Sequence, residues 1–514
     1  MAYPHTPMDT QHPDRRSLLR PSSLAFALVV VVGIAFRLHT RSELWLDEAL
    51  SANIARLPVG DMLRQLKHDG HPPLFYLLLH GWMEIFGKGD DATRSLSGIF
   101  GIACLPLMWV AARRYAGRAA AASAVVLLAT SPYAVRYSTE ARMYSMVIFF
   151  VLVGWLLVRS ALDNPTIARL VGIAVVSGLL ALTHYWSFYL LAATALLLLW
   201  MWRRQANAAA LRVTVALLAG AVLFLPWLPS FLEQSKHTGT PWGRPERPTQ
   251  IFTISFTDWG GGPNGEAQFL GIALVLLVLL ALFAVARDRR HIDVDLHTQP
   301  QARPEAYVVF ATLLIATVAS YASAAAFSSR YTAVIFPLVI LLAALGMTAF
   351  ADPRVRVGIL VVLSLFGLLG ASRNERGERT QNGHIAAYIV AHGGPGDVVA
   401  FCPDQLGPST LRHIPDTMRG MAFPNGSDPH LIDWVDYGKR QKAGSPTDFA
   451  AMVDKAAGPH ILWFVWSPGY RTLDTKCELT VNALKKLRPG GRPALASGSQ
   501  FEHAWLYEYV PVAP

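Results

Sequence analysis

Apolar runs long enough to cross a bilayer recur along most of this chain, and they constrain its fold more than any other feature. A helix needs about 17 to 25 apolar residues to cross the bilayer core, where its backbone groups find partners only within the helix. The runs are Leu24–Leu38, Ser95–Ala112, Ala119–Tyr133, Met143–Leu162, Leu170–Thr183, Phe188–Met201, Val213–Pro229, Phe269–Ala286, Ala306–Ala326, Thr332–Phe350 and Val357–Gly370. We therefore predict a polytopic α-helical membrane protein with about eleven transmembrane helices.

The charged residues are distributed unevenly around these runs. Lys and Arg outnumber Asp and Glu by 45 to 35, a net charge of +10 that nucleic acid or anionic lipid could balance. If the N-terminus is cytoplasmic, five arginine-bearing turns fall on the cytoplasmic side, namely residues 113–118, 159–169, 203–204, 287–303 and 352–356. The positive-inside rule then explains the excess. We predict a multi-pass protein of the cell (plasma) membrane that contacts membrane lipid and no nucleic acid.

The first run and one short run need separate interpretation. Arg15, Arg16 and Arg20 precede the first run, as in a signal peptide, but the bulky basic residues that follow it do not resemble a cleavage site. We favour an uncleaved first helix, with cleavage as the alternative. Counting Pro72–Phe86 as a crossing would place every later arginine turn outside, so this run is predicted to lie along the outer membrane interface.

The last part of the chain differs in kind from the apolar core of residues 1–372. Residues 373–514 combine a helical pattern at His384–Ala391 with short β-type runs, namely Val398–Phe401, Ile461–Trp466 and Ala504–Tyr509. This pattern predicts a small α/β domain, which the same threading places outside the cytoplasm. Cys402 and Cys477 lie in it and could pair in an oxidising compartment, although their spacing does not decide whether they do.

Candidate chemistry lies in the segments that this threading places outside. The external loop 40–91 holds Asp47 and Glu48 just beyond the first helix. A carboxylate held at a helix end can act as a general base and remove the proton from an acceptor hydroxyl. The alternative is structural, because Asp also favours the N-terminus of a helix, here predicted over Glu48–Leu57.

Two further outer segments carry polar side chains. His71, followed by paired prolines, could donate to an anionic group, or it could be a solvated histidine at a helix start. The turn Ser131–Tyr144 concentrates charged and tyrosine side chains that a phosphate, a sugar or Asp47 could engage. An aromatic belt with snorkelling arginines is the alternative for this turn.

Smaller polar groups mark two more helix mouths, Thr183–Trp186 and Ser328–Thr332. The positive-inside rule does not explain Arg330 at an outer mouth, so Arg330 is a candidate ligand for a lipid phosphate, with interfacial anchoring as the alternative. The loop from residue 230 to residue 268 contains Trp242 and Trp259. It could close over a substrate, or it could be a linker.

Taken in order, these features resemble a known family. The series is Asp47–Glu48, His71–Tyr76, Arg94, Tyr137–Tyr144 and Arg330–Tyr331 with Pro337. Over about Leu24–Gly346 it resembles the C-type (GT-C) membrane glycosyltransferases, specifically the protein O-mannosyltransferase and aminoarabinose-transferase-like group. The order and spacing of the motifs carry the resemblance, since no single motif is specific. The resemblance implies the GT-C fold for the membrane core.

The resemblance also implies an activity and its residues. Such an enzyme transfers a sugar, mannose or a related one, from a polyprenyl-phosphate donor, normally with inversion. The acceptor is a glycan, glycolipid or protein of the cell envelope at the outer face. Asp47 is implied as the general base and Glu48 as the neighbour that positions it. The residues implied to contact donor phosphate or substrate are His71, Glu140, Arg142, Tyr144, His184, Arg330 and Tyr331.

The sequence also bears on cofactors and on competing functions. The first loop has no Asp-x-Asp pair, and the one at residues 293–295 falls on the cytoplasmic side, so we predict no metal ligand and no obligatory cofactor. A transporter or flippase of lipid-linked sugars is one alternative, but it predicts charged groups within the spans, which are largely free of them. A non-catalytic envelope assembly partner is the other, and it would tolerate loss of Asp47.

Overall fold

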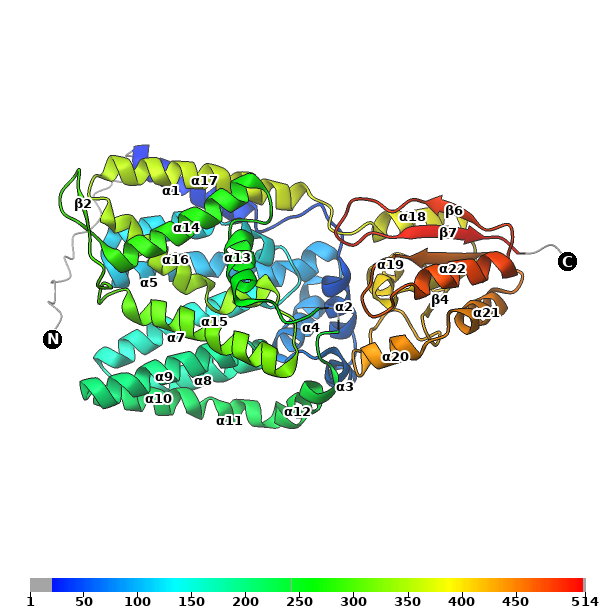
Figure 1. The fold of residues 1–514 in the computed structure, drawn as a ribbon, viewed down its shortest axis with the longest axis horizontal. Coiled ribbons are helices and arrows are strands. Elements are labelled where there is room, and N and C mark those ends of the chain that lie inside the picture. Colours follow the sequence, from blue (N-terminus) through cyan, green and yellow to red (C-terminus); the bar gives the residue numbers. More distant parts are fainter. Residues whose placement is uncertain (1–20, 242, 512–514) are drawn as a thin grey trace.

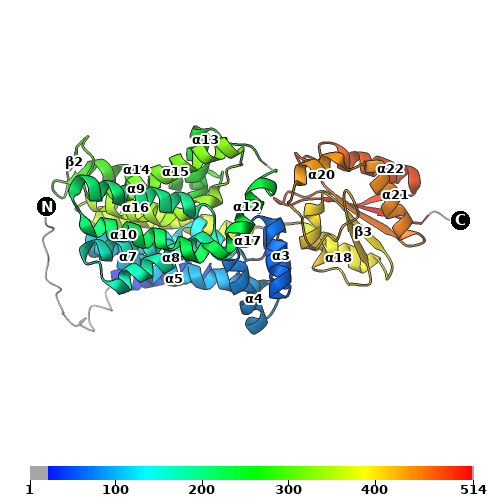
Figure 2. The same cartoon turned by 90° about the horizontal axis from the view of Figure 1, so that it is seen from below.

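The computed structural model describes residues 21–241 and 243–511, and two parts of unlike architecture follow each other along its long axis (Figure 1). Helices form a bundle at one end, and a sheet with flanking helices forms the other, as the second view also shows (Figure 2). Arg15, Arg16, Arg20 and Trp242, which entered the predictions above, lie outside the described residues. The predicted fold class is confirmed, because a helical core precedes a C-terminal region that contains a sheet.

The bundle contains the helices that the apolar runs predict. Of the described helical segments, six are long and apolar enough to cross a membrane: α5 (Asp90–Thr130), α7 (Tyr144–Asp163), Ala208–His237, α14 (Gly265–Phe283), α15 (Arg303–Ser323) and α17 (Pro353–Arg376). The third comprises α10 (Ala208–Ala219), α11 (Ala221–Phe224) and α12 (Leu228–His237). The other apolar helices are α1 (Pro21–Ala35), α8 (Ile167–Thr183), α9 (Ser187–Gln205) and α16 (Phe336–Gly346). Each predicted crossing overlaps a described helical segment.

Helix α5 consists of two arms that reverse direction near one glycine. Gly117 has a φ of +82°, a conformation that favours glycine because other residues place a Cβ atom there. Arg37 contacts both arms, since its carbonyl oxygen lies against Gly98 and its guanidinium donates to the carbonyls of Leu128 and Ala129 at 2.6 and 2.9 Å. The two arms therefore lie side by side, and they correspond to two successive predicted crossings.

Short helices form a layer at the end of the bundle that faces the sheet (Figures 1 and 2). They are α2 (Leu46–Ala55), α3 (Val59–Asp69) and α4 (Leu74–Phe86). Helix α4 contains the run predicted to lie at the membrane interface, and it is not threaded among the long helices. The segment between α12 and α14 contains a further helix, α13 (Pro248–Trp259), whose buried Trp259 donates its indole N–H to Thr332 Oγ1 at 2.9 Å.

The C-terminal part is built on a five-stranded sheet with the order β4-β3-β5-β7-β6. The strands are β3 (Val398–Cys402), β4 (Arg419–Ala422), β5 (Leu462–Trp466), β6 (Arg492–Leu495) and β7 (Trp505–Tyr509). Strand β3 is parallel to β4 and β5, whereas β7 is antiparallel to β5 and β6. The helices are α18 (Asn382–His392), α19 (Gly407–Leu411), α20 (Tyr437–Ala443), α21 (Pro446–Ala457) and α22 (Lys476–Leu487).

Both faces of this sheet are buried, which explains why its central strands are apolar throughout. Successive side chains of a strand point to opposite faces, so Ala400 packs into one hydrophobic core and Phe401 into another. The first core includes side chains of α21 and α22, such as Phe449 and Leu484, and the second includes Ile389 of α18. The sheet is therefore a layer between helices.

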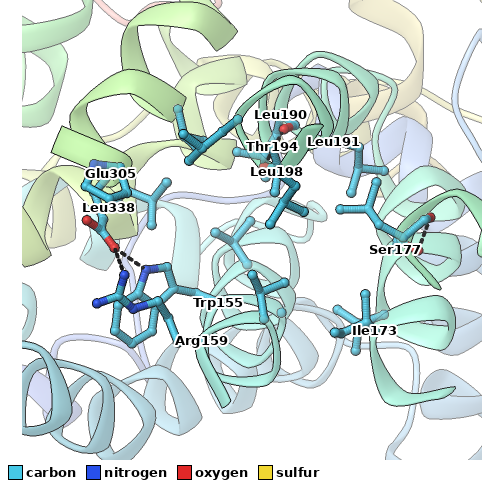
Figure 3. Close-up of a pocket in the computed structure, with 18 of the residues that line it drawn as sticks. Trp155, Arg159, Ile173, Ser177, Leu190, Leu191, Thr194, Leu198, Glu305 and Leu338 are labelled. Atoms are coloured by element: carbon cyan, nitrogen blue, oxygen red, sulfur yellow. Dashed lines mark hydrogen bonds and ion pairs between the residues drawn. The ribbon is translucent and has the colours of Figure 1, made fainter. Parts of the chain in front are cut away.

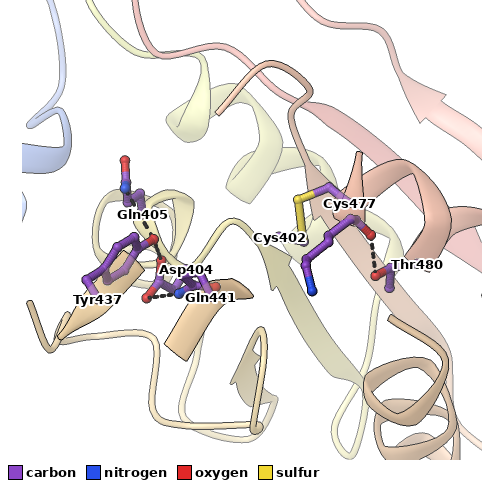
Figure 4. The surroundings of a disulfide bond; sticks show 8 residues. Cys402, Asp404, Gln405, Tyr437, Gln441, Cys477 and Thr480 are labelled. Carbon is purple, nitrogen blue, oxygen red and sulfur yellow. Dashed lines mark hydrogen bonds between the residues drawn. A yellow bond between two sulfur atoms is a disulfide. The ribbon is translucent and has the colours of Figure 1, made fainter. Parts of the chain in front are cut away.

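A disulfide and a small hairpin complete the fold. Cys402, at the end of β3, is bonded to Cys477 in the first turn of α22 (Figure 4), so the pairing that the sequence left open is present. In the bundle, β1 (Ala284–Ala286) and β2 (Ile292–Val294) form an antiparallel hairpin, so the last three residues of the predicted crossing Phe269–Ala286 are strand and β2 lies in the predicted arginine-bearing turn 287–303. The hairpin lies at the end of the bundle away from the sheet (Figure 1).

Candidate active site

Connections between helices bring distant polar residues together at the end of the bundle that faces the sheet. The contributing elements are the first turn of α2, the turn after α3, the turn before α7, and a 3-10 turn (Ser329–Val334) between α15 and α16. They supply Asp47, His71, Arg142 and Arg330 respectively. Arg142 contacts both His71 and the backbone of Asp47, and Arg330 pairs with the Asp47 carboxylate. These residues therefore form one cluster.

Asp47 is the carboxylate of this cluster that an external molecule can reach. Its side chain is 19% exposed and that of its ion-pair partner Arg330 is 20% exposed. The Arg330 guanidinium lies 6.0 Å from the Trp45 ring centre and 5.8 Å from that of Tyr331. Burial raises the pKa of Asp47, but Arg330 and Arg142 outweigh it, so this pKa lies below its ordinary value. Asp47 is therefore ionised near neutral pH.

Arg142 lies behind Asp47 and is held by neutral groups. Its guanidinium donates to Ser51 Oγ at 2.8 Å, to the Asp47 carbonyl at 3.3 Å and to Tyr76 Oη at 3.4 Å. It also donates to His71 Nε2 at 2.8 Å. Within the described part of the chain Arg142 makes no ion pair, and its Nε has no hydrogen-bond partner. Its positive charge is therefore not neutralised by direct contact with a carboxylate.

His71 is oriented by Asp69, a residue to which the sequence analysis gave no role. Because an arginine can only donate, His71 Nε2 must accept from Arg142, and Nδ1 then carries the proton. Nδ1 donates to Asp69 Oδ2 at 2.7 Å, and Tyr76 Oη donates to the same oxygen at 2.9 Å. Burial raises the pKa of Asp69, but contacts with His71 and Tyr76 and the charge of Arg142 outweigh it and lower this pKa below its ordinary value.

Aromatic side chains form the wall beside Arg330. The His184 ring lies 5.3 Å from that of Tyr331 and 5.7 Å from that of Tyr144, between ring centres. Trp186 adds a further ring 5.4 Å from Tyr331. The Tyr144 hydroxyl is among the described buried polar groups without a hydrogen-bond partner. The wall therefore presents flat aromatic faces and the unpartnered Tyr144 hydroxyl on the side of Arg330.

Glu48 is beside Asp47 in sequence but its carboxylate serves the framework. It is fully buried and accepts from Arg94 Nε and Nη2, both at 2.7 Å. It also accepts from the backbone N–H of Ala141 at 2.8 Å, next to Arg142. Glu48 therefore anchors the turn that carries Arg142, and its oxygens are engaged by protein groups.

Glu140, which the family resemblance implies as a contact of donor phosphate or substrate, is also engaged within the protein. Its side chain is almost completely buried. Oε1 accepts from Arg379 at 2.8 Å and from Arg136 at 3.2 Å. Arg379 belongs to the segment that leads into the C-terminal part. No sequence pattern predicted its contact with Glu140. Glu140 therefore links the Arg142 turn to that segment.

A cavity of about 120 Å³ lies elsewhere in the bundle, between α7, α8, α9 and α15 (Figure 3). Its polar end is formed by Glu305, which accepts from the Trp155 indole at 3.0 Å and lies 3.9 Å from Arg159. Arg159 is near the C-terminal end of α7, whereas Arg142 precedes its N-terminal end. The polar end of the cavity is therefore separated from the Asp47 cluster by most of the length of α7.

The described residues contain no group of three or more His, Cys, Asp or Glu side chains that could hold a metal ion. Around Asp47 the donor set instead consists of guanidinium, imidazole and hydroxyl groups. The expectation that no metal is obligatory stays a prediction.

Solved structures define the class to which this architecture belongs. ArnT from Cupriavidus metallidurans in the apo state is 14% identical and has a TM-score of 0.59, with 94% of this chain and 97% of that chain covered. The structure of the same protein bound to undecaprenyl phosphate has a TM-score of 0.53 at the same identity and coverage. The Archaeoglobus fulgidus oligosaccharyltransferase tethered with an acceptor peptide is 11% identical and gives 0.51, covering 96% of this chain and 74% of that chain.

At these identities the likeness concerns the fold, and it confirms the resemblance predicted from the sequence: the chain has the fold of the C-type membrane glycosyltransferases. More particularly, residues 70–229 match the family model described as dolichyl-phosphate-mannose-protein mannosyltransferase. That stretch includes His71, Arg142 and His184, whereas Asp47 and Arg330 lie outside it. No curated protein sequence matches the chain.

Proposed function

We propose that this protein is a membrane glycosyltransferase that moves a sugar from a polyprenyl-phosphate donor to a hydroxyl of a cell-envelope acceptor. The sugar is mannose or a related one, and the acceptor is a glycan, glycolipid or protein. The observation that carries the proposal is the partly exposed Asp47–Arg330 pair backed by Arg142. This arrangement places a base that can deprotonate the acceptor hydroxyl beside cations that can bind the donor phosphate, at the sheet-facing end of the bundle.

The chemistry is a single displacement at the anomeric carbon. Asp47 takes the proton of the acceptor hydroxyl while its oxygen forms the new bond to that carbon. The bond to the phosphate oxygen breaks, its electron pair leaves with the polyprenyl phosphate, and the configuration inverts. Negative charge grows on the phosphate during this step, so the guanidinium of Arg330, with Arg142 behind it, stabilises the transition state more than the ground state.

The ion pair itself suggests how the base becomes active. A carboxylate paired with Arg330 is a weak base, because the cation stabilises its ionised form. A donor phosphate competes for the same guanidinium. When Arg330 turns to the phosphate, Asp47 loses a cation that lowers its pKa, and its affinity for a proton rises. Proton removal is then favoured only when the donor is bound.

The proposal includes a topology in which the N-terminus is cytoplasmic and residues 373–514 form an extracytoplasmic domain. The arginine-bearing turns belong to the far end of the bundle, consistent with the positive-inside rule. The disulfide between Cys402 and Cys477 supports an oxidising compartment for the sheet. The undecaprenyl phosphate bound in the ArnT structure supports a lipid-phosphate donor.

The test is a transfer assay with purified full-length protein, radiolabelled polyprenyl-phosphate sugars and cell-envelope extract. Asp47→Ala should lower turnover by about three orders of magnitude, since it removes the general base. Its melting temperature and its binding of polyprenyl phosphate should stay close to those of the parent. Asp163→Ala, at the far end of α7, is the matched control and should keep full turnover. Retained turnover in Asp47→Ala would remove the proposal, and lipid flipping without transfer would favour the flippase.

A further inference from the structure

The two halves of the candidate site are held from outside the bundle by one short bridge. Residues Arg379–Gln381 lead into the sheet region, and Thr380 forms an isolated parallel β-bridge with Glu502, just before β7. The backbone N–H of Glu502 donates to the Arg379 carbonyl at 2.8 Å, and that of Gln381 donates to the Glu502 carbonyl at 2.9 Å. Arg379 and Glu502 are therefore rigidly joined neighbours, although they are far apart in sequence.

From this bridge Glu502 reaches the helix that carries Asp47. Its Oε2 accepts from the backbone N–H of Leu46 at 3.1 Å, at the first residue of α2. The first N–H groups of a helix have no partner within the helix, and Trp45 at the N-cap supplies no side-chain acceptor. Glu502 is buried, and its Oε1 accepts from Ser409 Oγ at 3.0 Å, which fixes its orientation. It therefore caps α2 from the C-terminal part.

Arg379 reaches the turn that carries Arg142. Its Nη1 donates to Glu140 Oε1 at 2.8 Å, and its backbone N–H donates to Ser42 Oγ at 2.9 Å. The backbone N–H of Arg142 in turn donates to the Glu140 carbonyl at 2.7 Å. The bridge therefore has two arms: Glu502 contacts α2, which carries Asp47, and Arg379 contacts the turn that carries Arg142.

We propose that Arg379 and Glu502 are positioning residues that set the placement of Asp47 relative to Arg142. The inference rests on the proposed function, and it assigns the C-terminal part a role in the chemistry of the bundle. A displacement of about 1 Å between reacting groups can lower a rate about a hundredfold. Loss of either arm should therefore act on the rate of transfer and leave donor binding by Arg330 intact.

Other contacts hold the C-terminal part against the bundle when Arg379 or Glu502 is substituted, so the effect of each residue can be measured separately. Arg412 of the C-terminal part pairs with Asp90 at 2.5 Å, and His413 pairs with Glu43 at 3.1 Å. The Asn53 amide also donates to the His430 carbonyl at 2.9 Å. Arg412→Ala removes an ion pair of the same kind as that of Arg379, and it is the matched control for docking.

The experiment compares kcat, the KM for the donor and the melting temperature across full-length variants. Glu502→Ala and Arg379→Ala should each lower kcat about 10- to 100-fold with donor KM within about twofold of the parent. Arg412→Ala should change kcat less than about threefold. Glu502→Gln keeps an acceptor for the Leu46 N–H and should restore most of kcat. Glu502→Asp keeps the charge but is one methylene shorter, and it should not.

The outcomes separate this inference from the proposed function. If Asp47→Ala is inactive while Glu502→Ala and Arg379→Ala match Arg412→Ala, the positioning role is refuted and the proposed function stands. If Glu502→Gln is as slow as Glu502→Ala, or if the donor KM rises while kcat is kept, the positioning role is refuted as well. If Asp47→Ala keeps its turnover, both fail together. Should Glu502→Ala not fold, the pair Glu502→Gln and Glu502→Asp decides, because both keep a polar side chain at that position.

Discussion

The bundle has an arginine–carboxylate pair near each end, and the two pairs differ in what surrounds them. At the far end Arg159 faces Glu305, which also accepts from Trp155, beside a cavity lined largely by aliphatic side chains (Figure 3). At the sheet-facing end Arg330 pairs with Asp47. Only the second pair is backed by a further arginine whose direct partners are neutral, among the residues that the structure describes.

This difference separates a structural pair from a candidate reaction centre. A buried ion pair is weak evidence for function, because each charge mainly compensates the desolvation of the other. Arg142 adds a second guanidinium whose direct hydrogen-bond partners are neutral, and the unpartnered Tyr144 hydroxyl accompanies it, so both have hydrogen-bonding capacity for an anion. We therefore expect substitutions at the sheet-facing end to lower activity strongly and substitutions at the far end to leave it nearly unchanged.

The largest difference should appear when one carboxylate at each end is replaced by its amide. Asp47→Asn should lower kcat/KM about a thousandfold or more, because the amide cannot take the acceptor proton. Glu305→Gln should keep kcat/KM within about twofold of the parent, because Glu305 touches no part of the proposed site. Both are measured in the transfer assay with purified protein. Equal losses in the two variants would abolish the distinction between the ends.

The arginines give the next largest difference. Arg330→Gln should lower kcat about 100- to 1000-fold, since it removes the partly exposed cation that stabilises the departing phosphate. Arg159→Gln should have no such effect on transfer. The same comparison can be checked without turnover by measuring how well polyprenyl phosphate displaces a fluorescent lipid from each variant. Normal phosphate binding and turnover in Arg330→Gln would show that the cation serves only as an anchor.

A smaller effect should come from the group that orients His71. Asp69→Asn can present an amide N–H to His71 Nδ1, which favours the tautomer whose Nε2–H points at Arg142. Two donors then face each other, and we expect kcat to fall about tenfold. Asp163→Asn is the control at the far end, where Asp163 pairs with exposed Arg114 at 2.5 Å. An unchanged rate in Asp69→Asn would show that the placement of Arg142 does not depend on His71.

The smallest effect concerns a buried carboxyl that has no arginine partner within the described residues, Asp404 (Figure 4). It accepts from Tyr437 Oη at 2.5 Å, and burial raises the pKa of Asp404 from 3.8 to about 7. Because the folded pKa exceeds the unfolded one, stability is fully present below pH 3.8 and is lost as pH rises through about 7.

This sign makes a testable statement about the C-terminal part. Between pH 7.5 and pH 5.5 the gain from Asp404 is ~2 kcal/mol, at about 1.4 kcal/mol per pH unit. Glu502, whose pKa burial also raises to about 7, acts with the same sign. The parent should therefore melt at a higher temperature at pH 5.5 than at pH 7.5, and Asp404→Asn should reduce that shift. A melting temperature that rises with pH in the parent would contradict the assignment.

Much of the fold could be predicted because its rules are local. Apolar runs determine the helices, and the arginine turns group the remaining connections at one end, which is why Asp47, His71, Arg142 and Arg330 were all expected in the outer segments. Glu48 and Glu140 were not distinguishable from them, because neighbouring sequence does not reveal that Arg94 pairs with Glu48 and that Arg379 donates to Glu140 Oε1.

The contacts that sequence reasoning missed join segments without a shared pattern. Leu46 and Glu502 are separated by 456 positions, and Arg379 and Glu140 by 239. Asp69 is different, since it stands two residues before His71 and could have been proposed as its partner. Its role follows only from the direction of the Arg142 hydrogen bond, which fixes the tautomer.

The disulfide between Cys402 and Cys477 has a consequence for how the two parts assemble. It closes a stretch of chain with a sequence separation of 75, within which Ile432 and Tyr437 belong to the hydrophobic cluster of the bundle. Closing this stretch restricts the conformations of those two side chains before they meet the bundle. Oxidative maturation of the C-terminal part should therefore promote its attachment, and a reducing environment should slow assembly at the very surface where Asp47 is placed.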